Sequence, residues 1–254
     1  MKIAVLLKEV VDLVEEIVVD GSTLDRDELA FRSNEFDDYA LEEALQMRAD
    51  EDTIDVYALD GDQTEAMLHM AVARGANNLF KVEIDGADFE EGISSRTAAH
   101  GFAKALDGGT YDLIVTGVQG VDDLDGSIAA HVGQIMGLPN LNVVIQVDRG
   151  DRNITCMKEF PGGVTGEYEV QLPAVIGIQA ARSPPSYIPV SKVRRAAQEA
   201  TINEKEVSVG DVKLSKLTAV SLPSGGDRAE MITGDVEEQA AKVLELLKSR
   251  GVVS

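Results

Sequence analysis

Asp112-Leu-Ile-Val-Thr-Gly-Val-Gln-Gly-Val-Asp-Asp-Leu-Asp-Gly-Ser127 joins the pattern of a buried strand to a loop of glycines and acids. Residues 112–116 include consecutive aliphatic side chains, as expected of a strand that is covered on both faces of a parallel sheet. The loop over 117–127 then leads into a helical pattern over 128–136. A strand, a loop and a helix in this order form the repeating unit of α/β folds.

Strand and helix patterns continue to alternate on both sides of this stretch. Strand patterns cover residues 2–7, 53–59, 79–84, 141–147 and 173–178, and helical patterns cover 34–48, 64–73 and 94–106. Glycine, the preferred residue after a helix, follows two of these helices. Strands that alternate with helices of this length predict an α/β fold, with a doubly wound, mostly parallel sheet that is covered on both faces.

The pattern changes after Gly150. Residues 153–160 and 166–172 flank Pro161-Gly162-Gly163, which predicts an antiparallel hairpin. Three prolines exclude regular structure over 183–189, because proline lacks an amide donor and fixes φ. A short basic segment follows over 192–195.

An extended arm and a terminal helix are predicted over residues 198–254, set apart from an α/β domain over 1–197. Asp235 and Glu238 fit a capping box at the start of that helix. Its apolar stripe consists of Val236, Ala240, Val243, Leu244 and Leu247. Such a stripe must be buried. The pattern alone leaves open whether its own domain or a partner subunit covers it.

Composition excludes several classes of protein. The chain of 254 residues has 45 acidic and 23 basic residues, and its net charge of −22 argues against nucleic acid or a membrane surface as a partner. Cys156 is the only cysteine, which excludes an internal disulfide and a multi-thiolate metal site, and we expect it to be buried and inert. The three histidines form no HExxH motif, so we expect no metal site. The apolar run at the N-terminus is short and acids follow it, unlike a signal peptide, so we expect a cytoplasmic protein that does not insert into a membrane.

The loop over 117–127 is the first candidate ligand site, because open parallel sheets bind ligands outside the carboxyl ends of their strands. Its glycines permit close approach of the backbone, and Ser127 offers a hydroxyl and amides to a phosphate at a helix start. The loop has no lysine or arginine, and the chain has neither a Walker lysine nor a GxGxxG motif. An acid-capped solvent turn is the alternative interpretation. Asp60-Gly61 and Asn34 are further candidates that we expect at the same edge of the sheet.

No catalytic set of residues can be identified. No pair of acids is distinguished by its spacing, and no nucleophile and base follow a pattern such as GxSxG. The sequence therefore disfavours a free-standing hydrolase and predicts a protein without catalytic residues of its own.

Six stretches, in this order, resemble the β subunit of electron-transfer flavoproteins, from the N-terminus to about Ala197. They are AVLLKEVVD (4–12), NEFDDYALEEAL (34–45), AVARGA (71–76), the loop over 117–127, KEFPGG with LPAV (158–163 and 172–175) and PPSYIPVSKVRRA (184–196). The loop is similar to the family's adenine-nucleotide loop, in which Gly-x-Gln-x-x-Asp is followed by acids and a hydroxyl before a helix. The resemblance therefore implies a sheet of the adenine-nucleotide-binding type.

The resemblance also implies a heterodimer. Its larger α subunit holds the redox-active FAD, whereas the β subunit holds a structural AMP and docks flavin dehydrogenases. The implied AMP-site residues are Lys8, Asn34, Asp60, Gly61, Gly117, Gln119, Val121, Asp122, Asp123 and Ser127. Of these, Asp60 and Gly61 match least well, because the family has Gly-Pro near there.

The implied partner-binding residues are Tyr187, Pro189 and Val190, which belong to the family's partner-recognition loop, and Glu159. Val190 aligns with an apolar anchor that is more often leucine, and Glu159 aligns with a glutamate that holds the FAD domain. A packing valine and an exposed strand acid are the competing interpretations. We expect the arm over 198–254 to pack on the partner subunit.

Two other functions stay open. A relative that bifurcates electrons would carry a second FAD in place of AMP, but this chain lacks the Gly-Pro-x-Gln-Ala-type stretch of that group. A stand-alone adenine-nucleotide-binding enzyme or sensor would be a monomer that binds ATP. The missing triphosphate loop and the proline-rich segment argue against it.

Overall fold

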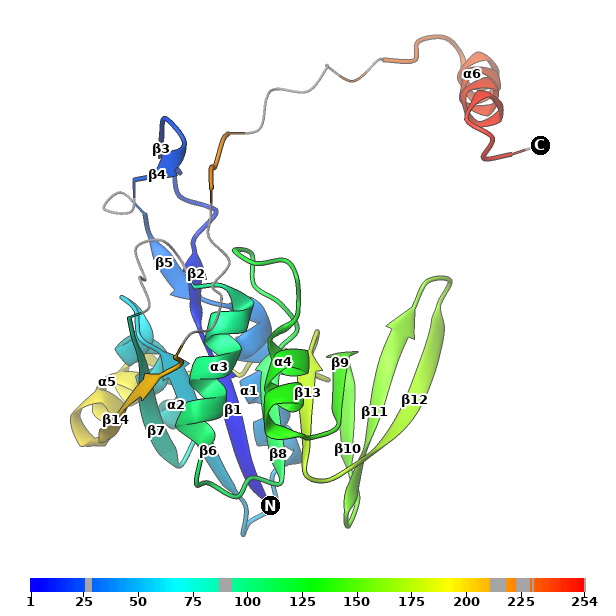
Figure 1. Cartoon of the computed structure of the whole chain (residues 1–254). Coiled ribbons are helices and arrows are strands. Elements are labelled where there is room, and N and C mark those ends of the chain that lie inside the picture. Colours follow the sequence, from blue (N-terminus) through cyan, green and yellow to red (C-terminus); the bar gives the residue numbers. More distant parts are fainter. Residues whose placement is uncertain (26–28, 87–92, 211–217, 223–228, 230, 254) are drawn as a thin grey trace. The chain divides into compact units, whose positions relative to one another are not determined.

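A seven-stranded parallel sheet forms the centre of the computed structural model, which describes residues 1–25, 29–86, 93–210, 218–222, 229 and 231–253 (Figure 1). Its strands have the order β14-β7-β6-β1-β8-β13-β9, and every neighbouring pair is parallel. The strands are β1 (Lys2–Leu7), β6 (Thr53–Leu59), β7 (Asn78–Asp85), β8 (Leu113–Gly117), β9 (Asn140–Val144), β13 (Ala174–Ile178) and β14 (Ile202–Ser208). The predicted doubly wound α/β fold is confirmed.

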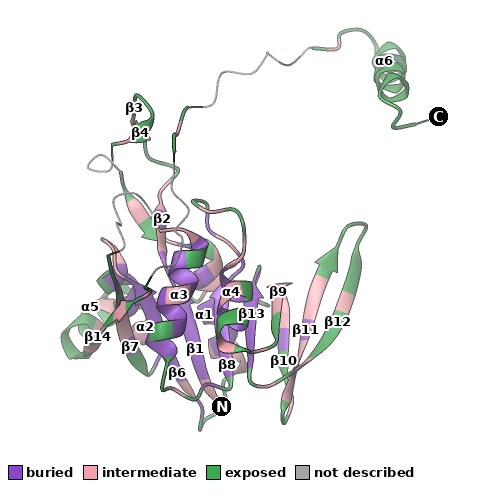
Figure 2. Cartoon of the chain, in the orientation of Figure 1, coloured by how far each residue is buried: buried purple, intermediate pink, exposed green. Residues whose placement is uncertain are grey.

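Helices cover both faces of the sheet because its strands are apolar on both sides. Along β1, Ile3, Val5 and Leu7 belong to one core cluster and Ala4 and Leu6 belong to the other. The helices are α1 (Glu35–Met47), α2 (Thr64–Arg74), α3 (Ser95–Leu106), α4 (Ile128–Met136) and α5 (Val190–Glu199). Apolar residues of α1 and α2 complete the first cluster, whereas those of α3 and α4 complete the second (Figure 2).

Among the described residues, three small antiparallel sheets accompany the large one. The strands β10 (Gln146–Arg149), β11 (Asn153–Phe160) and β12 (Val164–Gln171) form one of them, and β11 with β12 is the predicted hairpin. The other two pair β2 (Glu9–Val11) with β5 (Phe31–Ser33) and β3 (Val19–Asp20) with β4 (Thr23–Leu24).

The segment predicted as one strand over 141–147 is divided between two sheets. Its first part pairs with β13 as β9, and its second part pairs with β11 as β10. The register shifts next to this break, and Val143 has a φ of 64°. Positive φ is costly for a β-branched residue, and it bends the chain out of the extended conformation. Because of this bend, one apolar run can contribute a strand to each of the two sheets.

Two elements after Pro189 differ from the sequence prediction. The basic segment over 192–195 lies in helix α5. Residues 202–208 form strand β14, which pairs with β7 at the sheet edge, although they lie beyond the predicted domain boundary after residue 197. This strand carries charged residues, as sheet edges commonly do, and its pattern is therefore weakly apolar.

The chain divides into two compact units, Met1–Val220 and Ser221–Ser254. The second unit contains α6 (Val236–Ser249), where Asp235 and Glu238 form the predicted capping box. Its apolar residues Val243, Leu244, Leu246 and Leu247 are exposed. Of the predicted arm, residues 211–217, 223–228, 230 and 254 lie outside the described residues. Within the described part of the chain, no helix combines the length and the apolar character that crossing a membrane requires.

Candidate functional site

The order of the strands places a topological switch point at the carboxyl ends of β1 and β8. From β1 the chain winds outward to β6 and β7, and it then returns to the other side of β1 at β8. The helices α1 and α4 that follow β1 and β8 therefore lie on opposite faces of the sheet, and open α/β sheets bind ligands at such a switch point. The loop over 117–127 follows β8 directly at this edge (Figure 1).

Lys8 places an ammonium group against this loop. It is the first residue after β1 and is 7% exposed. Its Nζ donates to Asp122 Oδ1 at 2.7 Å and to Asp123 Oδ2 at 2.6 Å. Burial alone would lower the pKa of Lys8, but Asp122 and Asp123 raise it above its ordinary value. The loop has no basic residue of its own, and Lys8, directly after β1, supplies one positive charge to it.

The N-terminus of α1 holds the start of the loop. Asn34 Nδ2 donates to the carbonyl oxygen of Gln119 at 2.9 Å. The buried Asp37 carboxylate accepts from the amide of Lys8 at 2.8 Å and from the amide of Gly117 at 3.0 Å. Burial raises the pKa of Asp37 to about 7, although these two amides and the Lys8 charge favour the ionised form. One carboxylate thus joins the carboxyl ends of β1 and β8.

Glycine is required at position 117 by this contact. A Cβ there would lie 2.7 Å from the carbonyl carbon of Phe36 and would overlap the Asp37 carboxylate. Gly117 therefore allows the backbone at the end of β8 to lie close to α1.

The end of the loop is fixed at the N-terminus of α4. The Asp125 carboxylate accepts from the Ser127 amide at 3.0 Å and from the Ser127 hydroxyl at 2.9 Å. Asn142 Nδ2 donates to the carbonyl oxygen of Gly126 at 2.6 Å, and Gly126 has a φ of 60°. A carboxylate therefore occupies the donors of Ser127 that the sequence analysis assigned to a phosphate.

Asp60 and Gly61 lie at the same edge but have other contacts. Asp60 follows β6 and forms an ion pair with Lys81 at 3.1 Å. A Cβ at Gly61 would overlap the carboxylate of Glu9, and that carboxylate accepts from the amide of Gln63 at 2.7 Å. The predicted site residues that contact one another are Lys8, Asn34, Gln119, Asp122 and Asp123, with Gly117 joined to Lys8 through Asp37. Val121 is 40% exposed on the loop surface.

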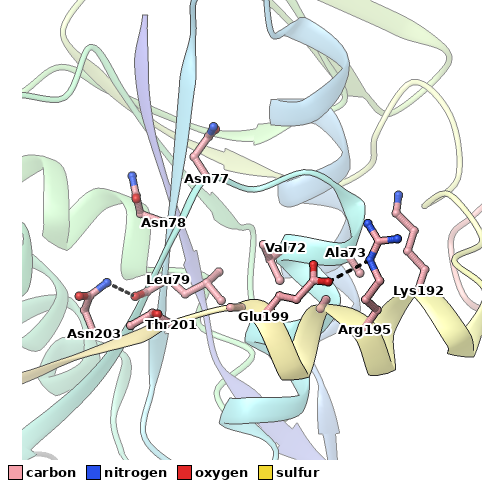
Figure 3. A pocket seen from close by; sticks show the side chains of 12 residues that line it. Val72, Ala73, Asn77, Asn78, Leu79, Lys192, Arg195, Glu199, Thr201 and Asn203 are labelled. Atoms are coloured by element: carbon pink, nitrogen blue, oxygen red, sulfur yellow. Dashed lines mark hydrogen bonds and ion pairs between the residues drawn. The ribbon is translucent and has the colours of Figure 1, made fainter.

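A cavity of about 450 Å³ lies elsewhere, between α2, α5 and the first residues of β7 and β14 (Figure 3). Two asparagines that line the cavity form structural hydrogen bonds: Asn77 accepts from the amide of Ile54, and Asn78 donates to Asp55. In Figure 3, Arg195 points toward Glu199, with which it forms an ion pair at 3.4 Å. The cavity lies at the amino ends of β7 and β14, whereas the switch point lies at the carboxyl ends of β1 and β8. The two sites are therefore separate.

Comparisons with known proteins identify the family. The family model described as "Electron transfer flavoprotein domain" matches residues 22–209. A protein of Methylophilus methylotrophus named electron transfer flavoprotein subunit beta is 30% identical, over 97% of this chain and 98% of the relative. The chain belongs to the electron transfer flavoprotein β-subunit family. Relatives of the same name from Syntrophomonas wolfei and Bacillus subtilis are 30% and 23% identical, over 98% and 100% of this chain and 96% and 100% of the relatives.

The residues that the family resemblance assigns to partners are accessible in the first unit. Tyr187 is 86% exposed and Val190 is 67% exposed, on either side of Pro189 at the start of α5. Glu159 is an exposed residue near the end of β11. Cys156, by contrast, is buried as predicted, and burial raises the pKa of its thiol to about 12, which disfavours the reactive thiolate.

Sequence reasoning missed Asp37, Asp125 and Asn142 as organisers of the loop. Asp37 lies in the first turn of a helix, where acids are common because they complement the helix dipole. Asp125 is one of several acids in the loop, and Asn142 lies in a strand pattern. The contacts of Asp37 with Gly117 and of Asn142 with Gly126 join separate segments, so no local spacing reveals them. The contact of Asp125 with Ser127 is local, but the neighbouring acids of the loop offer the same residue type.

Proposed function

We propose that this chain is the β subunit of a heterodimeric electron-transfer flavoprotein. It binds a structural AMP at the loop over 117–127 and docks flavin dehydrogenases through residues 187–190, while the α subunit carries the redox FAD. The observation that carries the AMP site is the position of this loop at the strand switch point, with the buried ammonium of Lys8 against it.

The charge of the loop favours a monophosphate. Lys8 is opposed by Asp122 and Asp123, so little positive charge is left for a chain of phosphates. Amides and a hydroxyl at a helix N-terminus can hold one phosphate without a lysine. Carboxylates such as those of Asp122 and Asp123 suit ribose hydroxyls, to which they are acceptors.

The contact of Asp125 with Ser127 is compatible with a bound phosphate because Asp125 is exposed. Its side chain can turn into solvent and release the amide and hydroxyl of Ser127 to the phosphate. The carboxylate then acts as a substitute for the phosphate when no nucleotide is bound, and the two anions compete for the same donors.

The nucleotide content of the purified heterodimer tests the AMP site. After denaturation, we expect chromatography to detect one AMP and one FAD per dimer. Ser127→Ala should reduce the retained AMP about tenfold through loss of one hydrogen bond to a charged group, with the FAD unchanged. Ser249→Ala removes an exposed hydroxyl in the second unit and is the control. Two FAD and no AMP would instead identify a bifurcating flavoprotein.

Docking through the start of α5 predicts a different phenotype. Val190→Ala removes apolar contact area and should raise the apparent KM for a partner dehydrogenase about three- to tenfold, with kcat and AMP content unchanged. Val14 is 83% exposed in a different part of the chain, and Val14→Ala is the matched control. Equal KM values for the wild type and Val190→Ala would refute the docking role.

A further inference from the structure

Two consecutive acids of α1 are buried, which is unusual for a helix on the outside of a sheet. Glu42 is 5% exposed and Glu43 is 0% exposed. Burying a carboxylate is costly unless hydrogen-bond donors or cations surround it. The groups that donate hydrogen bonds to these two carboxylates therefore indicate the role of the two acids.

Most of the donors come from the segment directly before the proposed docking residues. Glu43 Oε2 accepts from the amide of Arg182 at 3.0 Å, and Glu43 Oε1 lies 3.3 Å from the Arg182 guanidinium. Glu42 Oε2 accepts from the amide of Ser186 at 3.1 Å, and Glu42 Oε1 accepts from its hydroxyl at 2.9 Å. Gln46, one turn further along α1, donates to the hydroxyl of Ser183.

Residues 182–186 are thus attached to α1 at both of their ends. Between these attachments, Pro184 and Pro185 fix φ and have no amide donor. The very next residue, Tyr187, is 86% exposed. The attached segment therefore ends where the proposed contact surface begins.

We infer that Glu42 and Glu43 are positioning residues for partner docking: they hold residues 182–186 so that Tyr187 and Val190 are presented in a fixed arrangement. This inference rests on the proposed docking role of those two residues. Ordering a flexible segment at the moment of binding reduces affinity, and a segment that is ordered beforehand avoids most of that cost. Glu43 also accepts from the amide of Val147 at 2.8 Å, so it fixes β10 to the same helix.

Glu42→Gln is the sharpest test, because it keeps the shape of the side chain but leaves only one acceptor oxygen. One oxygen of the Glu42 carboxylate accepts from the Ser186 amide, and the other accepts from the Ser186 hydroxyl and from Gln46 Nε2. In either orientation a glutamine places an NH2 donor opposite one of these N–H donors. Ser186→Ala is the second variant, since it removes the hydroxyl from the other side of the contact. Glu35→Gln is the matched control, because Glu35 is an exposed acid of α1 that accepts from Tyr39 on its own helix.

Two measurements on the purified heterodimer are compared. Hydrogen exchange of a peptide that spans residues 180–190 reports the order of the segment, and few other amides contribute because residues 184, 185 and 189 are prolines. Electron transfer from a flavin dehydrogenase that reduces the wild-type heterodimer reports docking. For Glu42→Gln and Ser186→Ala we expect exchange about tenfold faster and an apparent KM raised about five- to tenfold, with kcat and AMP content unchanged. Glu35→Gln should match the wild type.

The outcomes separate this inference from the proposed function. If Val190→Ala raises KM but Glu42→Gln and Ser186→Ala leave both exchange and KM unchanged, the positioning role is wrong and the docking role stands. Faster exchange with an unchanged KM also overturns the inference, since the order of the segment would then not matter for docking. If Val190→Ala has no effect, the docking role itself fails.

Discussion

Alanine at position 117 is expected to cost about 3 kcal/mol of unfolding free energy and to abolish AMP binding. The added Cβ would lie 2.7 Å from the carbonyl carbon of Phe36 and within the space of the Asp37 carboxylate. Phe36 and the buried Asp37 lie in the first turn of α1, so neither group can move without displacing the contact that joins β1 to β8. Urea unfolding and nucleotide analysis of Gly117→Ala measure the two effects.

Gly137→Ala is the matched control for this substitution. Gly137 follows α4 with a φ of 67°, and nothing lies within 4 Å of the position of its Cβ. Alanine there should cost about 1–2 kcal/mol, from the left-handed backbone conformation alone, and should retain AMP. Equal stability losses in the two variants, with AMP retained in both, would show that position 117 has no special packing requirement.

Stability is expected to decrease as the pH rises from acid to neutral, because of Asp37. In the unfolded chain Asp37 has its ordinary pKa of 3.8, whereas burial raises the pKa to about 7 in the folded protein. The folded state therefore binds this proton more tightly. Its contribution to stability is greatest below the unfolded pKa, falls as the pH rises, and is lost above about 7.

Asp37→Asn isolates this contribution, since asparagine has the same shape but does not titrate. The difference in unfolding free energy between the wild type and Asp37→Asn should change by on the order of 3 kcal/mol between pH ~5 and pH ~8, to the disadvantage of the wild type at the higher pH. Urea unfolding at both pH values measures it. The exposed acid Glu35 lies on the same helix, and Glu35→Gln should follow the wild type. A difference that does not vary with pH would mean that Asp37 has a normal pKa.

The sheet and most of its helices could be predicted because each depends on a local pattern. The apolar run of β8, the glycine after α2 and the capping box of α6 are all readable within about a dozen residues. Strand β14 was missed because an edge strand with acids on its exposed side lacks that apolar pattern. The break between β9 and β10 was missed because one apolar run enters two sheets.

The candidate site was predicted only in part, for a similar physical reason. Gly117 and Ser127 were recognisable because their residue types suit a loop before a helix. Asn34 was a candidate because it lies at the start of a helix at the same edge. The family resemblance then supplied Lys8, Asp122 and Asp123, and the structure places these three residues and Asn34 around one loop. The role of Asp37 depends on two amides from different strands, and one of them is 80 residues away in the sequence. Long-range contacts of this kind are set by the tertiary arrangement, which no local pattern records.

The central position of β1 has a consequence for the order of events during synthesis. This strand precedes both of its neighbours in the chain, which are residues 53–59 and 113–117. A nascent chain can pair β1 with β6 while β8 has not yet been made, which leaves one edge of β1 without a partner. Parallel pairing across such sequence separations is slow, and an unpaired apolar edge is prone to association with other chains. The interval between translation of β6 and of β8 is therefore the period in which a nascent chain of this fold most needs protection by chaperones.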